Sequence, residues 1–360
     1  MRIAIASPVL VEVPPKTFGG PQLMVYELAM GLAARGHKIT VFCSGDSRLP
    51  HPNIEVVESC PGPTLDLPGR NRHIEAKQFI SVLARQNDFD VIHFFYEPVV
   101  CEINIEGEEL NILTLFKKPI ISSFRNLTDI PKHINYYKKN REKLKDIPKL
   151  FLSNSHRSFV DFLDKTKVIY NGIDISRYAF SNKKEDYLMF LGRITKEKGI
   201  LEAIKVAKKT GSKMIVAAKI CPADKNFYEN EVRHLIDGKQ IKYVGEVNFE
   251  QKIFYLTKAK ALLFPIHWAE PFGLVMAEAL ACGTPVIGFN RGSVPEIVND
   301  GYNGYVVRNL KEMVTKIKEI DKIKPENCRK SVEEKFSRRK MIDEYEKTYL
   351  KLIKNKACRF

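Results

Sequence analysis

The sequence predicts an α/β protein built from two open, parallel-sheet domains in tandem. Short runs of β-branched residues alternate with amphipathic stretches along the whole chain, which is the pattern of parallel strands covered by helices on both faces. The chain has 360 residues, and because single cores stop growing at roughly 250–300 residues, two domains are expected. A content of 44% hydrophobic and 28% charged residues excludes disordered and fibrous chains.

The first domain is predicted to span residues 1–168. Helix-like segments over residues 21–35, 72–85 and 156–163 separate six strand-like runs. These runs are RIAIASPV, KITVFC, IEVV, DVIHFF, PIISSF and KLFLSN. The first run lacks the basic lead-in and cleavage site of a signal peptide and the length of a membrane helix, so we expect a buried strand there.

The second domain is predicted to span residues 169–336, because an Asn-Gly pair and polar turn residues within 166–181 separate two series of strands. Its strand-like runs are YLMFLG, KMIVAA, IKYVG, ALLFP, TPVIGF and GYVV. Its helix-like segments cover residues 199–208, 227–236, 250–257 and 273–281. A last helix over 337–356 has apolar side chains along one side and is expected to pack back onto the first domain.

The excess of positive charge is concentrated in two stretches. The formal net charge is +15, and much of it lies in residues 131–149 and 311–360, both of which are predicted to be helical. We favour solvated helix faces for both stretches. An anionic acceptor or peripheral contact with an anionic membrane is the second interpretation, and nucleic acid is the least favoured.

The cysteines indicate a reducing environment. Seven cysteines are scattered along the chain and none is spaced as Cys-x-x-Cys, so neither a disulfide framework nor a zinc site is indicated. We therefore expect a cytoplasmic protein, either free or peripheral to the inner face of the membrane.

The segment FPIHWAEPFGLVMAEALACGTPVIGF holds the richest set of candidate binding residues. Glu270 follows the end of a predicted strand, and Pro271 suits the first position of a helix. The backbone amides of that first turn then have no acceptor within the helix and form a site for phosphate. These predicted donor-binding amides belong to Phe272, Gly273 and Leu274.

A second carboxylate follows on the same predicted helix. Glu278 lies two turns beyond Glu270, which separates the two side chains by about 10–12 Å along the helix axis. The carboxylate pair of a glycosidase needs roughly 5–9.5 Å, so the spacing favours a ligand with two hydroxyl-rich ends and an anionic middle. The alternative is a capping Glu followed by an ordinary surface Glu.

Basic and glycine residues in two other loops suit the same ligand. Arg193 and Lys198 follow the run YLMFLG and combine a fork of donors with a point charge, which suits a diphosphate. Gly19 and Gly20 lie between the first predicted strand and helix and allow the backbone to approach a ligand. Taken alone, each feature is more commonly a solvated loop or a turn.

Four motifs together resemble one known family. They are GG at 19–20, YNGID at 170–174, LGRITKEKG at 191–199 and EPFGLVMAEALACGTPVIGFNRGSVPEIV at 270–298. In this order they resemble glycosyltransferase family 4, and the resemblance covers essentially the whole chain. It implies the GT-B fold, in which two Rossmann-like, doubly wound domains face each other across a cleft. It also implies a nucleoside diphosphate sugar bound mainly by the C-terminal domain, retention of anomeric configuration, and no metal or other cofactor.

The resemblance assigns roles to the matching residues. Glu270 matches the residue that binds hydroxyls of the donor sugar, and Glu278 matches the residue that binds the ribose. Arg193 and Lys198 match the pair that neutralises the diphosphate leaving group. The resemblance therefore implies that Glu270, Arg193 and Lys198 are the catalytic residues.

Residues of the first domain complete the predicted site. Gly19 and Gly20 match the loop that approaches the diphosphate from the other domain. Family members commonly have a histidine where this chain has Arg125, which can donate to a sugar hydroxyl or a phosphate but cannot act as a neutral acid or base. His93 ends the preceding strand, so both side chains are candidate sugar or acceptor contacts. The D-x-D of residues 88–90 enters a strand at its amino end, opposite the expected ligand edge, and is not predicted to bind metal.

The sequence therefore predicts a retaining glycosyltransferase that moves a sugar from a nucleoside diphosphate sugar to an acceptor. That acceptor is a glycan, a lipid-linked sugar or a small molecule. Two alternatives stay open: a GT-B phosphorylase or nucleotide-sugar epimerase, and a protein that binds nucleotide sugar without catalysis.

Overall fold

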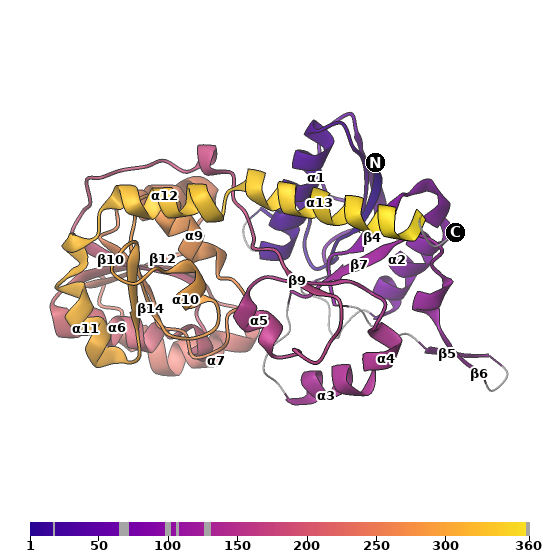
Figure 1. The fold of residues 1–360 in the computed structure, drawn as a ribbon. Coiled ribbons are helices and arrows are strands. Elements are labelled where there is room, and N and C mark those ends of the chain that lie inside the picture. Colours follow the sequence, from indigo (N-terminus) through magenta and orange to yellow (C-terminus); the bar gives the residue numbers. More distant parts are fainter. Residues whose placement is uncertain (17–18, 65–71, 98–101, 106–107, 126–130, 358–360) are drawn as a thin grey trace. The chain divides into compact units, whose positions relative to one another are not determined.

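The computed structural model describes residues 1–16, 19–64, 72–97, 102–105, 108–125 and 131–357, and it divides into two compact units (Figure 1). The first unit consists of residues 1–172 together with 338–360, and the second unit consists of residues 173–337. Each unit contains one parallel sheet, with seven strands in the first and six in the second. The predicted α/β class with two parallel-sheet domains is confirmed.

The sheet of the first unit has the strand order of a doubly wound fold. Its strands are β1 (Arg2–Ala6), β2 (Lys38–Ser44), β3 (Ile54–Cys60), β4 (Val91–Phe94), β7 (Ile120–Ser123), β8 (Lys149–Phe151) and β9 (Thr166–Val168). The order across the sheet is β3-β2-β1-β4-β7-β8-β9, with parallel pairing throughout. The order reverses between β1 and β4, and in open sheets this switch point is where ligands bind.

The helices of the first unit include the last helix of the chain. They are α1 (Gly20–Ala34), α2 (Arg72–Ala84), α3 (Pro131–Lys139), α4 (Arg141–Leu144), α5 (Asn154–Ser158) and α13 (Arg338–Ala357). The long helix α13, yellow in Figure 1, contacts α1 and buries Tyr345 and Tyr349. Gly31 of α1 permits this contact, because a Cβ there would lie 1.9 Å from a methyl carbon of Ile342.

Three elements of the first unit differ from those predicted. Strand β9 lies in the segment expected to link the domains, where only three residues pair with β8. An antiparallel hairpin of β5 (Glu102–Ile105) and β6 (Glu108–Asn111) was not predicted. Helix α5 begins earlier than expected because Ser153 caps it, its Oγ accepting from the amide of His156 at 3.0 Å.

The second unit repeats the same arrangement. Its strands are β10 (Tyr187–Arg193), β11 (Lys213–Lys219), β12 (Ile241–Gly245), β13 (Ala261–Phe264), β14 (Val286–Phe289) and β15 (Gly304–Val307). The order is β12-β11-β10-β13-β14-β15, again with parallel pairing. The switch point of this sheet therefore lies between β10 and β13.

Helices cover the second sheet. They are α6 (Ile200–Thr210), α7 (Lys225–Phe227), α8 (Phe249–Lys258), α9 (Leu274–Ala281), α10 (Val294–Ile297), α11 (Leu310–Ile317) and α12 (Pro325–Lys335). Helix α8 starts with a capping box in which the side chains of Asn248 and Gln251 each accept from the other's amide. The single helix predicted over 227–236 was wrong, because α7 passes into a π-helical turn at Tyr228–Val232 and then a 3₁₀ turn.

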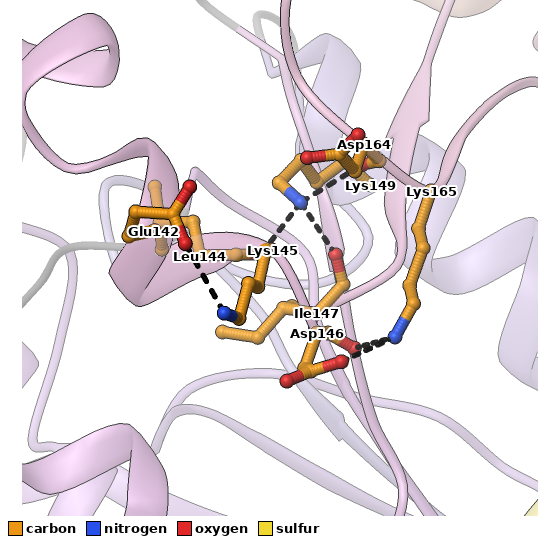
Figure 2. Close-up of polar contacts among 8 residues, drawn as sticks. All are labelled: Glu142, Leu144, Lys145, Asp146, Ile147, Lys149, Asp164 and Lys165. Atoms are coloured by element: carbon orange, nitrogen blue, oxygen red, sulfur yellow. Dashed lines mark hydrogen bonds and ion pairs between the residues drawn. The ribbon is translucent and has the colours of Figure 1, made fainter.

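A buried lysine fixes the segment that follows α4. The Lys149 side chain is fully buried at the start of β8. Its ammonium donates to the carbonyl oxygens of Leu144 and Ile147, both at 2.7 Å, and of Asp164 at 3.0 Å (Figure 2). One cation thereby joins the end of α4 to the loop before β9 through three carbonyl oxygens.

Replacing Lys149 by Met is expected to remove a pH-dependent part of the stability. Burial lowers the pKa of the Lys149 ammonium to about 8, while the unfolded chain keeps the ordinary value of 10.5. As pH rises, the folded state therefore releases the Lys149 proton before the unfolded chain does, and the free energy of unfolding increases. This gain in stability is complete above pH 10.5 and is lost as pH falls through 8. Urea unfolding should show the wild type gaining about 3 kcal/mol over Lys149→Met across this window.

Lys145→Met is the matched control, because Lys145 is an exposed lysine of the same segment. The wild type should gain no such stability over this control as pH rises. A free-energy difference between wild type and Lys149→Met that is constant with pH would contradict the assignment.

Candidate active site

The candidate site of the second unit lies at the carboxyl edge of its sheet, where β10 and β13 are neighbours. Parallel strands end at the same edge, so the loop of residues 194–199 meets the loop of residues 265–273. The amide of His267 donates to the carbonyl of Glu197 at 2.7 Å and ties the two loops together.

Gly199 allows these two loops to approach closely. Its φ is +75°, and a Cβ at this position would lie 1.9 Å from the carbonyl oxygen of Pro265. Any other residue would therefore force the loops apart. The preceding turn is capped by Thr195, whose Oγ1 accepts from the amide of Lys198 at 3.3 Å.

The closest contact between the loops is an ion pair. Lys198 Nζ lies 2.5 Å from Glu270 Oε2, and the two side chains are only 17% and 12% exposed. The ammonium also lies 4.6 Å from the ring centroid of Trp268, within reach of a cation–π interaction. The structure thus brings together two residues predicted for the site, with Trp268 as a third that sequence reasoning missed.

The backbone of Glu270 is held from the loop after β14. A Cβ on Gly292 would lie 2.4 Å from the backbone nitrogen of Glu270, so only glycine permits this contact. The amide of Ser293 donates to the carbonyl of Glu270 at 3.0 Å, and its hydroxyl donates to the carbonyl of Phe272 at 2.8 Å. The carboxylate therefore projects from a rigid support.

The start of α9 corrects one prediction. The helix begins at Leu274 and not at Pro271, with Gly273 as its N-cap in the left-handed region at φ +74°. The physical reason is the Phe272 ring, which is buried and packs 5.6 Å from the ring of Phe336, so the chain enters the core before it turns into the helix. The amides of the first helical turn therefore start at Leu274, while Phe272 and Gly273 precede it.

Glu278 is buried and already paired. It is 3% exposed, and its Oε1 lies 2.5 Å from Lys252 Nζ of α8 and accepts from the Tyr178 hydroxyl at 3.1 Å. Burial, reinforced by the Glu278 charge, raises the pKa of Tyr178 well above its ordinary value, so this phenol keeps its proton. Lys252 and Tyr178 thus hold this carboxylate. Sequence reasoning found neither residue, because no motif marks them.

Arg193, the last residue of β10, lies on the same edge. Its Nη2 is 3.5 Å from Glu197 Oε1, and the side chain is 32% exposed. In the first unit, Gly19 precedes α1 with φ +149°, and a Cβ there would lie 2.7 Å from Val11. Gly20 is the first residue of α1. Phe18, before this glycine pair, lies outside the described residues.

His93 of β4 is enclosed in the first unit. The side chain is fully buried, with Nδ1 2.7 Å from the Tyr349 hydroxyl and Nε2 2.7 Å from the Ser123 hydroxyl. Burial, with the nearby Arg125 charge, lowers the pKa of the imidazole well below its ordinary value, so the ring is neutral near pH 7. Both ring nitrogens have protein partners in this structure.

Arg125 is enclosed in the same way. It is 5% exposed, and its guanidinium carbon lies 3.7 Å from the ring centroid of Phe95. It donates at 2.8 Å to Asn171 Oδ1 and at 2.8 Å to the Tyr345 hydroxyl of α13. The residue at the family's histidine position thus binds the last helix of the chain, and sequence reasoning did not link it to that helix.

Both units of the chain match models of known protein families. Residues 18–177 match the family model described as Glycosyltransferase Family 4, and residues 174–336 match Glycosyl transferases group 1. The chain belongs to glycosyltransferase family 4. The two matches follow each other and cover both units, so the resemblance predicted from the four motifs is confirmed.

Relatives of this family-4 chain fall into two groups. Over nearly its whole length it is 24% identical to N-acetyl-alpha-D-glucosaminyl L-malate synthase of Bacillus anthracis, covering 94% of this chain and 95% of the relative. A shorter match, 30% identical over 207 residues, is to an uncharacterized 41.2 kDa protein in the cps region of Klebsiella pneumoniae. That match covers 52% of this chain and 55% of the relative.

Solved structures confirm the GT-B fold of the two Rossmann-like domains. HepE of Anabaena, solved in complex with UDP and glucose, matches with a TM-score of 0.72 at 17% identity. The match covers 97% of this family-4 chain and 99% of HepE.

No described helix is long and apolar enough to cross a membrane. The part of the chain described here contains no cluster of three or more His, Cys, Asp and Glu side chains arranged to hold a metal. In the D-x-D sequence, Asp88 pairs with Arg85 at 3.0 Å and Asp90 pairs with Arg2 at 3.2 Å.

Replacing Arg125 by Met is expected to lower the free energy of unfolding by about 3 kcal/mol. The change leaves the buried Asn171 oxygen and the Tyr345 hydroxyl without their donor. Arg35→Met is the matched control, because Arg35 also binds α13, through Asp343 and Glu346, but at the surface. The control should cost about 1 kcal/mol or less. If chemical denaturation shows the same decrease in the free energy of unfolding for both variants, the buried hydrogen bonds of Arg125 stabilise the fold no more than a surface ion pair does.

Proposed function

We propose that this chain is a retaining glycosyltransferase that moves a sugar from a nucleoside diphosphate sugar to an acceptor hydroxyl. The observation that carries the proposal is the contact of Lys198 with Glu270 at the switch point of the second sheet, where α9 begins with Leu274. This arrangement supplies a cation and helix amides for a diphosphate, together with a carboxylate for sugar hydroxyls.

The proposed roles follow from the charges. Lys198 and Arg193 bind the diphosphate and stabilise the negative charge that grows on it as it leaves. Glu270 accepts hydrogen bonds from hydroxyls of the donor sugar. The amides at the start of α9 bind phosphate oxygens, and Glu278 binds the ribose while keeping its contact with Lys252.

The proposed reaction needs no nucleophile from the protein. The acceptor oxygen bonds to the anomeric carbon on the face from which the diphosphate departs, as the bond between that carbon and the phosphate oxygen breaks. Because the new bond forms on the same face as the bond that breaks, the anomeric configuration is retained. A phosphate oxygen of the leaving group takes the acceptor proton. We propose that neither a metal ion nor another cofactor takes part, because Lys198, Arg193 and the helix amides supply the positive field.

The relatives suggest where to look for donor and acceptor. The Bacillus anthracis relative is named for joining an N-acetylglucosaminyl group to malate, and HepE was solved with UDP and glucose. UDP sugars are therefore the first donors to test. Small hydroxy acids, glycans and lipid-linked sugars are the acceptor classes to compare.

The test is nucleotide release from UDP-glucose, UDP-N-acetylglucosamine and GDP-mannose, with and without each acceptor class, with free phosphate, and with EDTA. Release that needs an acceptor, persists in EDTA and gives a product of unchanged anomeric configuration by NMR supports the proposal. Release that needs phosphate indicates a phosphorylase, and an altered donor sugar without release indicates an epimerase. Tight binding with no turnover indicates a non-catalytic binder.

We also propose peripheral contact of α3 with an anionic membrane, where a lipid-linked acceptor would be met. Lys138 and Lys139 are exposed on this helix. Some neighbouring cations are already paired, as Figure 2 shows for Lys145 with Glu142 and Lys165 with Asp146. The proposal therefore rests on the exposed lysines of α3.

Co-sedimentation with phosphatidylglycerol vesicles tests this contact. A Lys138→Glu, Lys139→Glu variant should lose binding that is salt-sensitive in the wild type. The matched control carries Lys208→Glu and Lys209→Glu, which change two exposed lysines of α6. Equal binding by wild type and the α3 variant, or no binding by the wild type at low salt, would refute the contact.

A further inference from the structure

We propose that the Glu270 carboxylate occupies, in the free protein, the position on Lys198 that the diphosphate takes when the donor binds. Donor binding then exchanges one anionic partner of Lys198 for another, and the return of Glu270 expels the nucleoside diphosphate after transfer. This inference rests on the proposed function and adds a release step to the same site.

The geometry of the ion pair is the first observation. Lys198 Nζ and Glu270 Oε2 are 2.5 Å apart, and both side chains are largely withdrawn from solvent. A diphosphate cannot reach the ammonium on its Glu270 side while this contact lasts. Because water screens such a pair less than a surface pair, its rupture must be compensated by new contacts to both partners.

Rigid backbones are the second observation. Gly199 packs against the Pro265 carbonyl, and Gly292 packs against the backbone nitrogen of Glu270. Neither contact leaves room for the loops to move closer, and the Ser293 amide further holds the Glu270 carbonyl. The exchange therefore proceeds by rotation of the two side chains and not by closer approach of the loops, and the long lysine stem allows this rotation.

Trp268 supplies the third observation. Its ring face lies 4.6 Å from Lys198 Nζ and keeps the ammonium in place when the carboxylate leaves. Its indole nitrogen is buried and has no acceptor among the described residues. An oxygen of a bound ligand would satisfy this donor, which offsets part of the cost of opening the ion pair.

Donor and product then differ in their effect on Glu270. The intact donor brings sugar hydroxyls that hydrogen-bond the carboxylate released from Lys198. The nucleoside diphosphate product has lost the transferred sugar and its hydroxyls, so it leaves Glu270 unpaired beside phosphate oxygens of like charge. Glu270 therefore favours donor binding and opposes product binding.

The experiment compares calorimetric binding of UDP, GDP and ADP to the wild type and to Glu270→Gln. The nucleoside diphosphate that binds the wild type most tightly is expected to bind Glu270→Gln about fivefold more tightly, because the carboxylate charge that competes for Lys198 is gone. Turnover of the matching nucleotide sugar should fall in the same variant. Glu270→Ala should likewise bind the nucleoside diphosphate more tightly and turn over more slowly. It replaces Glu270→Gln in the test if Glu270→Gln does not fold.

Glu202→Gln is the matched control for charge. Glu202 lies on α6 and pairs with His267 at 3.2 Å, so its replacement removes one nearby negative charge without freeing Lys198. Its effect on nucleotide affinity should be under twofold. Glu270→Gln should also give no tightening in a Lys198→Met background, since no ammonium is then released.

Each result has one meaning. Unchanged or weaker nucleotide binding by Glu270→Gln and Glu270→Ala overturns the exchange, as does equal tightening by Glu202→Gln. If the wild type binds none of the three nucleotides and turns over no nucleotide sugar, the proposed function itself fails. Binding by the wild type without the change in Glu270→Gln leaves the proposed function standing and removes only this inference.

Discussion

Replacing Lys198 by Met is expected to reduce turnover about 100- to 1000-fold while the protein stays folded. The ammonium is the cation held deepest in the candidate site, 2.5 Å from Glu270 and over the Trp268 ring. Met keeps the length of the stem and removes the charge that would stabilise the leaving diphosphate. Steady-state release of nucleotide from the preferred donor, at saturating acceptor, measures the loss.

Lys196→Met is the matched control for this substitution. Lys196 lies in the same short turn as Lys198 but is exposed. The control should retain wild-type turnover within about twofold, since a solvated charge is strongly screened. Turnover of Lys198→Met within a factor of a few of the wild type, with an intact thermal transition, would refute the assigned role.

Replacing Gly199 by Ala is expected to cost at least about 2 kcal/mol of stability and to lower turnover about 100-fold. The new methyl group would lie 1.9 Å from the Pro265 carbonyl oxygen, and the left-handed φ of +75° adds strain. The loops that hold Lys198 and Glu270 must then separate. Urea unfolding and donor turnover together measure the two effects.

Gly211→Ala is the control that distinguishes backbone strain from the steric clash with Pro265. Gly211 ends the same helix, α6, with a similar φ of +68°, but a Cβ there would meet nothing within 4 Å. It should cost about 1 kcal/mol and leave turnover unchanged. Gly199→Ala behaving like Gly211→Ala would show that the close approach of the two loops has no consequence for the site.

The fold could be predicted from sequence because many residues carry the same signal. Alternation of buried strands with amphipathic helices extends over both units, and a mistake at one element leaves the pattern intact. The missed elements are short. Strand β9 has three residues, and the start of α9 depends on Phe272 entering the core against Phe336, a contact made across distant parts of the chain.

Sequence motifs could identify individual residues of the candidate site, but they could not predict the contacts among these residues. Motifs identified Lys198 and Glu270 separately, but their ion pair depends on β10 and β13 being neighbours in the sheet. The partners of Glu278 could not be predicted for the same reason, because Lys252 lies on another helix. Arg125 was expected near a ligand, while its contact with Tyr345 depends on where the last helix packs.

The position of α13 has a consequence for synthesis on the ribosome. Tyr345 and Tyr349 complete the burial of Arg125 and His93, yet they are translated only after the whole second unit. The nascent first unit must wait with these polar groups uncovered until residues 173–337 have emerged. The second unit can therefore fold during translation before the first is finished, which reverses the usual order from N-terminus to C-terminus.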